Sequence, residues 1–157
     1  MEQNPRQPRR NKPEIGLRAR ALGILARREY SRPELARKLA QYTDNPDEIP
    51  ALLDEFEQRG WLSEGRVVEQ VLASRRGRFG AHRIMHELRE KGVSAAAIAG
   101  AQQQLKDSEF EAAREVWRKK FGIFPADARD KARQMRFLQG RGFSSDVIRR
   151  LLRDADE

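Results

Sequence analysis

The sequence predicts an all-α protein built from three tandem three-helix repeats, about nine helices in an elongated, curved array. Apolar residues recur three and four positions apart within short segments, which is typical of amphipathic helices. Serine, proline and glycine mark the ends of these segments. Two apolar columns return about every 50 residues: Leu39, Leu88 and Leu138, and, ten positions after each, Ile49, Ile98 and Ile148. A common period of this length indicates an internal repeat.

The first repeat is expected at residues 15–62, with its first helix beginning near Gly16. Ser31-Arg-Pro-Glu34 predicts a capping box at the start of the second helix, in which Ser31 and Glu34 bond each other's backbone N–H groups. Asn45-Pro-Asp-Glu48 predicts the start of a third helix, with Pro46 in its first position. Gly60 is expected to end that helix.

The second repeat is expected at residues 63–107 and opens with Ser63 as a helix cap. The turn Gly77–Gly80 leads into a central helix, which Gly92 is expected to end in a left-handed conformation. Ser94 then caps an alanine-rich helix. These signals predict a second set of three helices.

The third repeat is expected at residues 108–157. Ser108-Glu-Phe-Glu111 predicts another capping box. A middle helix follows Pro125 and ends at Gly140-Arg-Gly142, and Ser144 caps the last helix. Residues 1–14 hold three prolines and little apolar surface, so we expect a disordered basic leader that is solvated.

The composition points to a polyanionic partner. The chain of 157 residues has 32 Lys and Arg against 24 Asp and Glu, a net charge of +8. Such a balance favours nucleic acid over a membrane surface. The absence of cysteine excludes disulfides and thiol chemistry. No apolar run has the length of a membrane span, and no secretion signal is recognisable, so the expected location is the cytoplasm.

The sequence gives no positive reason to propose an enzyme, a metal site or a cofactor. His82 and His86 are four residues apart, a spacing that allows two zinc ligands on one helix face. The metalloprotease pattern requires glutamate after the first histidine, and Arg83 stands there. Both histidines also lie away from the apolar face of the predicted helix. They are therefore interpreted as surface residues.

Basic residues cluster where the first helix of each repeat ends. A single cation at a helix C-terminus is explained by the helix dipole. Three clusters on a periodic scaffold favour a basic stripe that meets phosphates or a nucleoprotein polymer. With Arg83 of the central helix, the candidate binding residues are Arg27, Arg28, Arg75, Arg76, Arg78, Arg83, Arg118, Lys119 and Lys120. Trp61, Phe79 and Trp117 are interpreted as packing residues rather than as platforms for bases.

Four segments resemble the RecX family of bacterial recombination regulators: LARREYSRPELARKL at 25–39, Gly60-Trp-Leu62, FGAHRIMHELREKGV at 79–93, and FLQGRGF at 137–143. The resemblance covers residues 17–152. It implies tandem three-helix repeats that bind the RecA recombinase, lie as a monomer in the groove of the RecA–DNA filament and restrain filament growth. Weak nonspecific contact with DNA accompanies this expectation. At Ser63-Glu64 the chain departs from the family, which usually has two aspartates there.

Two other functions stay open at this point. The first is a free-standing DNA-binding protein built from helix-turn-helix-like units. The expected second helices begin Ser-Arg-Pro-Glu, Ala-His-Arg-Ile and Ala-Asp-Ala-Arg, which share no pattern for reading bases. The second is a hydrolase that binds zinc through His82 and His86. Both rank below the filament regulator.

Overall fold

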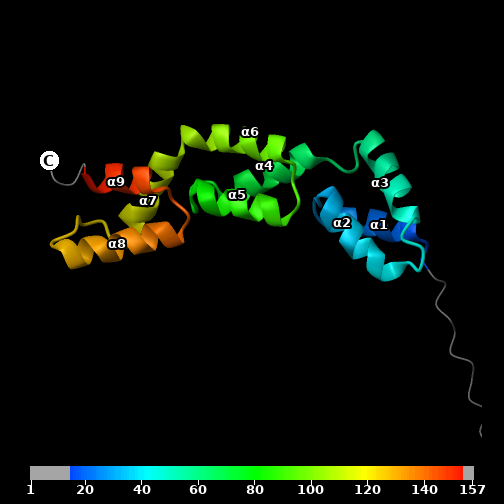
Figure 1. Cartoon of the computed structure of the whole chain (residues 1–157), viewed down its shortest axis with the longest axis horizontal. Helices are drawn as coiled ribbons and strands as arrows, with labels where there is room; N and C mark the ends of the chain where they lie inside the picture. Colours follow the sequence, from blue (N-terminus) through cyan, green and yellow to red (C-terminus); the bar gives the residue numbers. More distant parts are fainter. Residues whose placement is uncertain (1–14, 154–157) are drawn as a thin grey trace, which may run out of the picture.

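The computed structural model describes residues 15–153, and within this range the chain is all-α (Figure 1). Nine α-helices and one short 3₁₀ segment account for its regular structure. The helices are α1 (Leu17–Leu25), α2 (Arg32–Leu39), α3 (Glu48–Gln58), α4 (Glu64–Arg75), α5 (Ala81–Glu90), α6 (Ala95–Lys106), α7 (Glu109–Lys120), α8 (Ala128–Gly140) and α9 (Ser145–Arg153). The predicted leader, residues 1–14, lies outside the described range.

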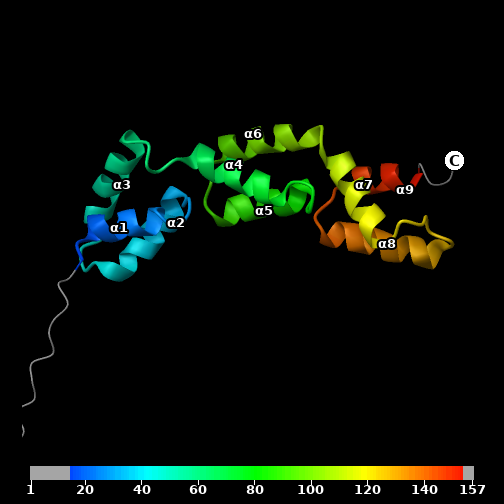
Figure 2. The ribbon, with the colours of Figure 1, turned by 180° about the vertical axis from the view of Figure 1, so that it is seen from behind.

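The helices pack in three triplets, α1–α3, α4–α6 and α7–α9, which follow one another in a row. Both views of the ribbon show a long, arched molecule with the second triplet between the other two (Figures 1 and 2). Helix packing is more extensive within a triplet than between triplets. This is the architecture of a repeat protein, in which each unit contacts only its neighbours.

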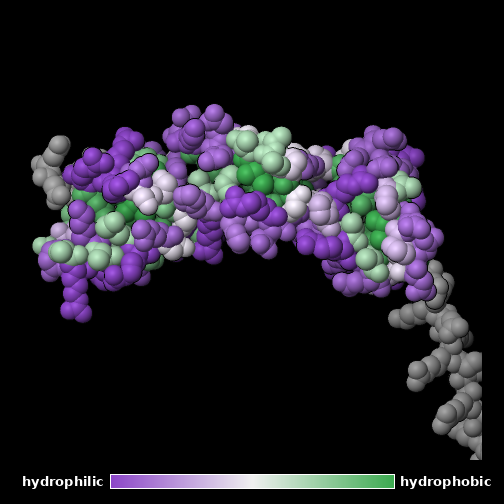
Figure 3. Space-filling view, in the orientation of Figure 1, coloured by the Kyte–Doolittle hydropathy of each residue, from purple (hydrophilic) through white to green (hydrophobic). Residues whose placement is uncertain are grey.

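Each triplet has its own apolar core, and the repeated leucine is at its centre. Leu39, Leu88 and Leu138 are completely buried, in three separate clusters. Hydrophilic side chains cover most of the face seen in Figure 3, with apolar groups visible inside each triplet. The clusters agree with the repeats expected at 15–62, 63–107 and 108–157, and these boundaries remain our interpretation.

Most of the local helix signals are confirmed. The side chain of Ser31 accepts from the Glu34 backbone N–H, and Glu34 accepts from that of Ser31, so the first capping box is complete. The hydroxyl groups of Ser63, Ser94 and Ser144 each accept from a backbone N–H three residues later. Ser63 therefore caps α4 although the chain departs from the family sequence at this position.

Two local predictions are wrong. Ser108 precedes α7 but makes no side-chain cap, because its backbone is helical and its hydroxyl donates to the Leu105 carbonyl instead. Pro46 is not the first helical residue: α3 begins at Glu48, and Pro46 lies in the turn before it. In both cases a helix follows the predicted start, but the residue that begins or caps it differs from the prediction.

A joint between the first two triplets forms where the start of α2 meets the end of α5. The Ser31 hydroxyl, besides capping α2, donates to the carbonyl of Lys91. The Lys91 ammonium lies 3.3 Å from a Glu34 carboxylate oxygen. Gly92 has a φ of +75°, as its predicted left-handed role requires, and a side chain at this position would overlap Pro33. Glycine is therefore required here for both conformation and space.

The joint between the second and third triplets repeats this arrangement. The turn before α5 meets the turn after α8: the Gly80 N–H donates to Arg141 O at 2.8 Å, and the His82 N–H to Gly142 O at 3.1 Å. A carboxylate oxygen of Glu109 accepts from the Ser144 N–H at 3.0 Å and lies 3.5 Å from the Ala81 N–H. Direct backbone–backbone bonds and the Glu109 carboxylate contribute to this joint, whereas a side-chain ion pair contributes to the first.

Candidate protein and nucleic-acid interface

Arginines from two triplets surround the ring of Phe79, in the turn between α4 and α5. The guanidinium carbon of Arg83 lies 4.1 Å from the ring centroid, and those of Arg75, Arg78 and Arg141 lie 5.3 to 5.9 Å from it. Cation–π attraction holds guanidinium groups at such distances. Phe79 is half-buried. It therefore serves as a common platform that gathers positive charge at the joint.

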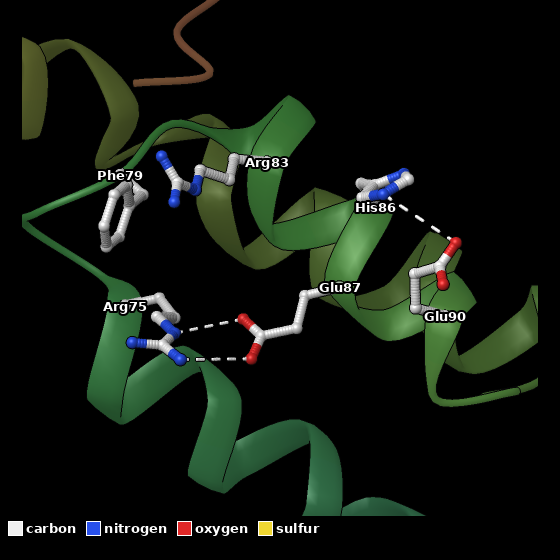
Figure 4. A pocket seen from close by; sticks show the side chains of 6 residues that line it. All are labelled: Arg75, Phe79, Arg83, His86, Glu87 and Glu90. Atoms are coloured by element: carbon white, nitrogen blue, oxygen red, sulfur yellow. Dashed lines mark hydrogen bonds and ion pairs between the residues drawn. The ribbon is translucent and has the colours of Figure 1, made fainter. Parts of the chain in front are cut away.

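Arg75 is neutralised by a carboxylate within this cluster. Its Nε and Nη2 donate to the two carboxylate oxygens of Glu87 at 3.1 and 3.3 Å (Figure 4). Hydrogen bonding to Glu87 raises the pKa of Arg75. The pair lies in a pocket of about 350 Å³, which Phe79 and Arg83 also line. His86 and Glu90 line the same pocket farther along α5 (Figure 4).

The other three arginines of the Phe79 cluster have no carboxylate partner among residues 15–153. Arg83 Nη1 lies 3.5 Å from the Gly140 carbonyl, and Arg141 Nη1 donates to the Arg78 carbonyl at 3.3 Å. Each of these two contacts crosses the joint between triplets. The cluster thus holds three guanidinium groups whose charge is not locally compensated.

Arg141 is a member of the cluster that the sequence did not indicate. The sequence indicates Gly140-Arg-Gly142 as a helix end within the FLQGRGF segment and Phe79 as a packing residue, and it does not place Arg141 among the binding residues. The one available signal was a lone arginine between two glycines, near a helix end like the other clusters. Nothing in the sequence pairs it with Phe79, which lies 62 positions earlier.

The first predicted cluster, Arg27 and Arg28, lies beyond the end of α1 and is exposed. Arg28 stacks on the ring of Tyr30, with its guanidinium carbon 3.7 Å from the centroid. It also lies 3.7 Å from the Glu34 carboxylate, which bonds Lys91 at the first joint. Arg28 therefore lies beside the first joint much as Arg78 lies at the second.

The third predicted cluster, at the end of α7, contacts side chains of its own triplet. Arg118 and Lys119 both lie beside the Glu115 carboxylate, at 2.8 and 3.7 Å, one turn back on α7. Hydrogen bonding to Arg118 lowers the pKa of Glu115. Lys120 differs, because its ammonium lies over the ring of Phe137, 5.3 Å from the centroid.

The side chain of Arg76 contacts neither the Phe79 ring nor a carboxylate of the described residues. Its Nη2 donates to the backbone carbonyl of Gln104 at 3.0 Å, in the last turn of α6. This bond caps a helix end inside the second triplet. Of the nine predicted binding residues, Arg75, Arg78 and Arg83 are therefore brought together, and the others lie in separate surroundings.

The histidines lie on the surface, as predicted. Both are exposed, and His86 Nε2 is 3.8 Å from a carboxylate oxygen of Glu90. Within residues 15–153 there is no group of three or more His, Asp or Glu side chains that could hold a metal ion. No helix in the same part of the chain combines the length and apolar character needed to cross a bilayer.

Trp117 is a packing residue, as predicted, and Trp61 is partly exposed. Trp117 is 7% exposed, and its Nε1 donates to Gln134 Oε1 at 2.8 Å. Trp61 is 39% exposed, and the guanidinium groups of Arg18 and Arg59 lie within 6 Å of its ring centroid. The buried Gln134, which no pattern in the sequence singled out, also donates to the Ile123 carbonyl.

Comparisons with known proteins agree on one family. Residues 107–152 match the family model described as the third three-helix domain of RecX. The chain is 53% identical over 146 residues to the regulatory protein RecX of Leptothrix cholodnii, with 93% of each chain covered. It is 44% identical over 152 residues to that of Ralstonia nicotianae, covering 97% of this chain and 92% of the relative.

Solved structures agree on the fold. The crystal structure of RecX from Lactobacillus salivarius superposes with a TM-score of 0.76 at 18% identity, covering 89% of this chain and 94% of the other. At this identity the likeness concerns the fold alone. The sequence relatives carry the assignment further, because they match almost from end to end. The chain belongs to the RecX family of regulatory proteins.

Proposed function

We propose that this protein is a regulator, mainly an inhibitor, of RecA. In this proposal the monomer lies in the groove of the RecA–DNA filament and spans neighbouring RecA protomers. It limits filament growth and so lowers ATP hydrolysis, strand exchange and repressor cleavage in DNA repair and the SOS response. RecA is proposed as the partner because members of the RecX family bind and restrain it. The protein acts in the cytoplasm.

The observation that carries the proposal is the arched row of triplets with arginines at its joints. A long body whose cationic groups recur along its length matches a groove that repeats along a polyanionic filament. Arg28 lies beside the first joint, and Arg78, Arg83 and Arg141 lie at the second. The basic face that we propose comprises these residues with Arg27, Arg75, Arg76, Arg118, Lys119 and Lys120.

The alternative is a free-standing DNA-binding protein. One observation favours it: Arg83 is exposed in the first turn of α5, the second helix of its triplet. This is where a helix-turn-helix unit places side chains that contact bases. Against it, the guanidinium of Arg83 is held over Phe79, which removes it from free base reading.

The test is a titration of RecA ATP hydrolysis on single-stranded DNA with the purified protein. Single-stranded DNA is kept in excess over both proteins, so that competition for DNA does not contribute. Inhibition at substoichiometric ratios supports a regulator that acts on filaments. Unchanged hydrolysis at equimolar protein contradicts the proposal. Sequence-specific DNA binding without RecA, resistant to excess nonspecific DNA, would favour the alternative.

A further inference from the structure

We propose that the joint between the second and third triplets is a phosphate-binding site for a single nucleic-acid strand. Arg78, Arg83 and Arg141 bind the phosphodiester, and Phe79 holds them in position. The inference refines one part of the proposed basic face. The binding that it predicts requires no RecA, so it can fail or succeed separately from RecA regulation.

The charge balance at the joint favours an anion. Four guanidinium groups lie within 6 Å of the Phe79 ring centroid, and Glu87, which bonds Arg75, is the carboxylate that compensates one of them. Like charges held this close repel one another, so an added anion relieves the repulsion. The Glu109 carboxylate also lies at this joint, but it contacts the backbone N–H groups of Ser144 and Ala81. Three guanidinium groups around the ring therefore have no carboxylate partner in the described part of the chain, and this is the physical reason for a site here.

The guanidinium groups also retain donors for a ligand. Each guanidinium has five N–H donors in a planar fork that matches the oxygens of a phosphate. Arg83 and Arg141 each direct one Nη1 group to a backbone carbonyl across the joint. Most of their donors therefore remain free, while the ring and the carbonyls fix the side chains. A preorganised arginine loses less entropy when it binds.

A row of cations continues beyond the joint, and it favours a nucleic-acid strand as the ligand over a single carboxylate group. Arg141 lies 5.3 Å from the Phe79 centroid and 5.4 Å from that of Phe137. The Lys120 ammonium lies over the same Phe137 ring. The positive charges thus continue from the α4–α5 turn to the end of α7. An extended ligand with regularly spaced charges, such as a nucleic-acid backbone, contacts such a row, whereas one carboxylate occupies a single point.

The acidic residues of the pocket determine at which end of it a phosphate binds. Glu90 lies along α5, away from the Phe79 turn, whereas the carboxylate of Glu87 reaches Arg75 (Figure 4). Glu87 is bonded to Arg75, and Glu90 lies beside His86. A phosphate therefore binds at the Phe79 end, toward Arg141 and the third triplet. Because Arg141 belongs to the third triplet, the site is complete only while the joint is docked.

The experiment measures binding of a fluorescently labelled single-stranded oligonucleotide to the whole protein by anisotropy, without RecA, at several salt concentrations. The variants are Arg78→Gln, Arg83→Gln and Arg141→Gln. Each is expected to weaken binding several-fold at low salt. Each should also reduce the slope of log affinity against log salt by about 0.7 for every phosphate that the variant no longer neutralises. Thermal melting verifies that each variant is folded.

Arg89→Gln is the matched control. It removes the same charge from the same helix as Arg83→Gln, at an exposed position outside the Phe79 cluster. Equal losses in Arg83→Gln and Arg89→Gln would overturn the site, because net charge alone would then explain binding. Arg83→Lys retains the charge but not the planar fork, so its binding is expected to fall between those of the parent and Arg83→Gln.

A second measurement separates this site from a contact with RecA itself. Inhibition of RecA ATP hydrolysis is measured for the same variants with single-stranded DNA in excess. Weakened oligonucleotide binding supports the site, whether or not inhibition persists. If the variants bind the oligonucleotide as the parent does but no longer inhibit RecA ATP hydrolysis, the phosphate site is overturned. The arginines would then contact carboxylates of the partner protein, and the proposed function would remain intact.

Discussion

The backbone N–H of Gly80 donates to the carbonyl of Arg141 at 2.8 Å and joins two helix triplets at the turn that carries Phe79. The same approach brings the Arg141 side chain within 5.3 Å of the Phe79 ring centroid. The joint and the arginine cluster are therefore one structural unit. A change that separates the triplets also dismantles the cluster.

Gly80→Ala is expected to destabilise the protein by about 1–3 kcal/mol, the usual cost of overpacking a buried contact. A methyl group at this position would overlap the backbone of Gly142 and Phe143. Urea unfolding followed by circular dichroism measures the change. Gly23→Ala is the control: it lies in α1 with no other group within 4 Å, so a gain of about 0.5–1 kcal/mol is expected. A Gly80→Ala variant as stable as the parent would contradict the close docking.

Leu88→Ala is expected to cost about 2–5 kcal/mol, because it removes a completely buried side chain from the core of the second triplet. The loss combines the transfer free energy of the removed atoms with the cavity that remains. Thermal and urea unfolding measure it. A melting temperature equal to that of the parent would show that Leu88 does not occupy the core.

Glu34→Gln is expected to lower stability at neutral pH and to have no effect in acid. Burial by itself would raise the pKa of Glu34, but the Ser31 backbone N–H and the Lys91 ammonium outweigh it and lower the pKa below its ordinary value of 4.5. A carboxyl group whose pKa is lowered on folding stabilises the protein above the unfolded pKa. That contribution is lost as the pH falls through the folded pKa.

Melting temperatures of the parent and Glu34→Gln should therefore converge as the pH falls below about 4.5 and differ above it. Glu90→Gln is a matched substitution at a carboxylate that is 72% exposed, and its effect at neutral pH should stay within about 0.5 kcal/mol. A constant difference between Glu34→Gln and the parent across the whole pH range would show that Glu34 does not act through its charge.

Charge reversal at Arg75, Arg76 and Arg78, each to Glu, is expected to weaken binding to the RecA–DNA filament and to flatten its salt dependence, with the fold retained. Fewer cations near the polyanion release fewer counterions on binding. Filament co-sedimentation at several salt concentrations measures the effect. The control reverses three exposed arginines elsewhere: Arg89, Arg149 and Arg153. Unchanged affinity with unchanged folding would place the binding face elsewhere.

The sequence by itself determined the features that depend on neighbouring residues. The Ser31–Glu34 capping box forms because both partners lie within one helical turn. The periodic leucines, Leu39, Leu88 and Leu138, are buried because the 3.6-residue period places them on the apolar face of each middle helix. Gly92 ends α5 because only glycine readily adopts its left-handed backbone.

The tertiary structure alone decided which distant residues meet. Gln134 is buried because docking of α8 brings it to the indole of Trp117, and nothing near it in the sequence indicates this. Arg141 joined the Phe79 cluster by the same route: contacts between residues about 60 positions apart depend on how two folded triplets dock, and local periodicity does not encode that geometry.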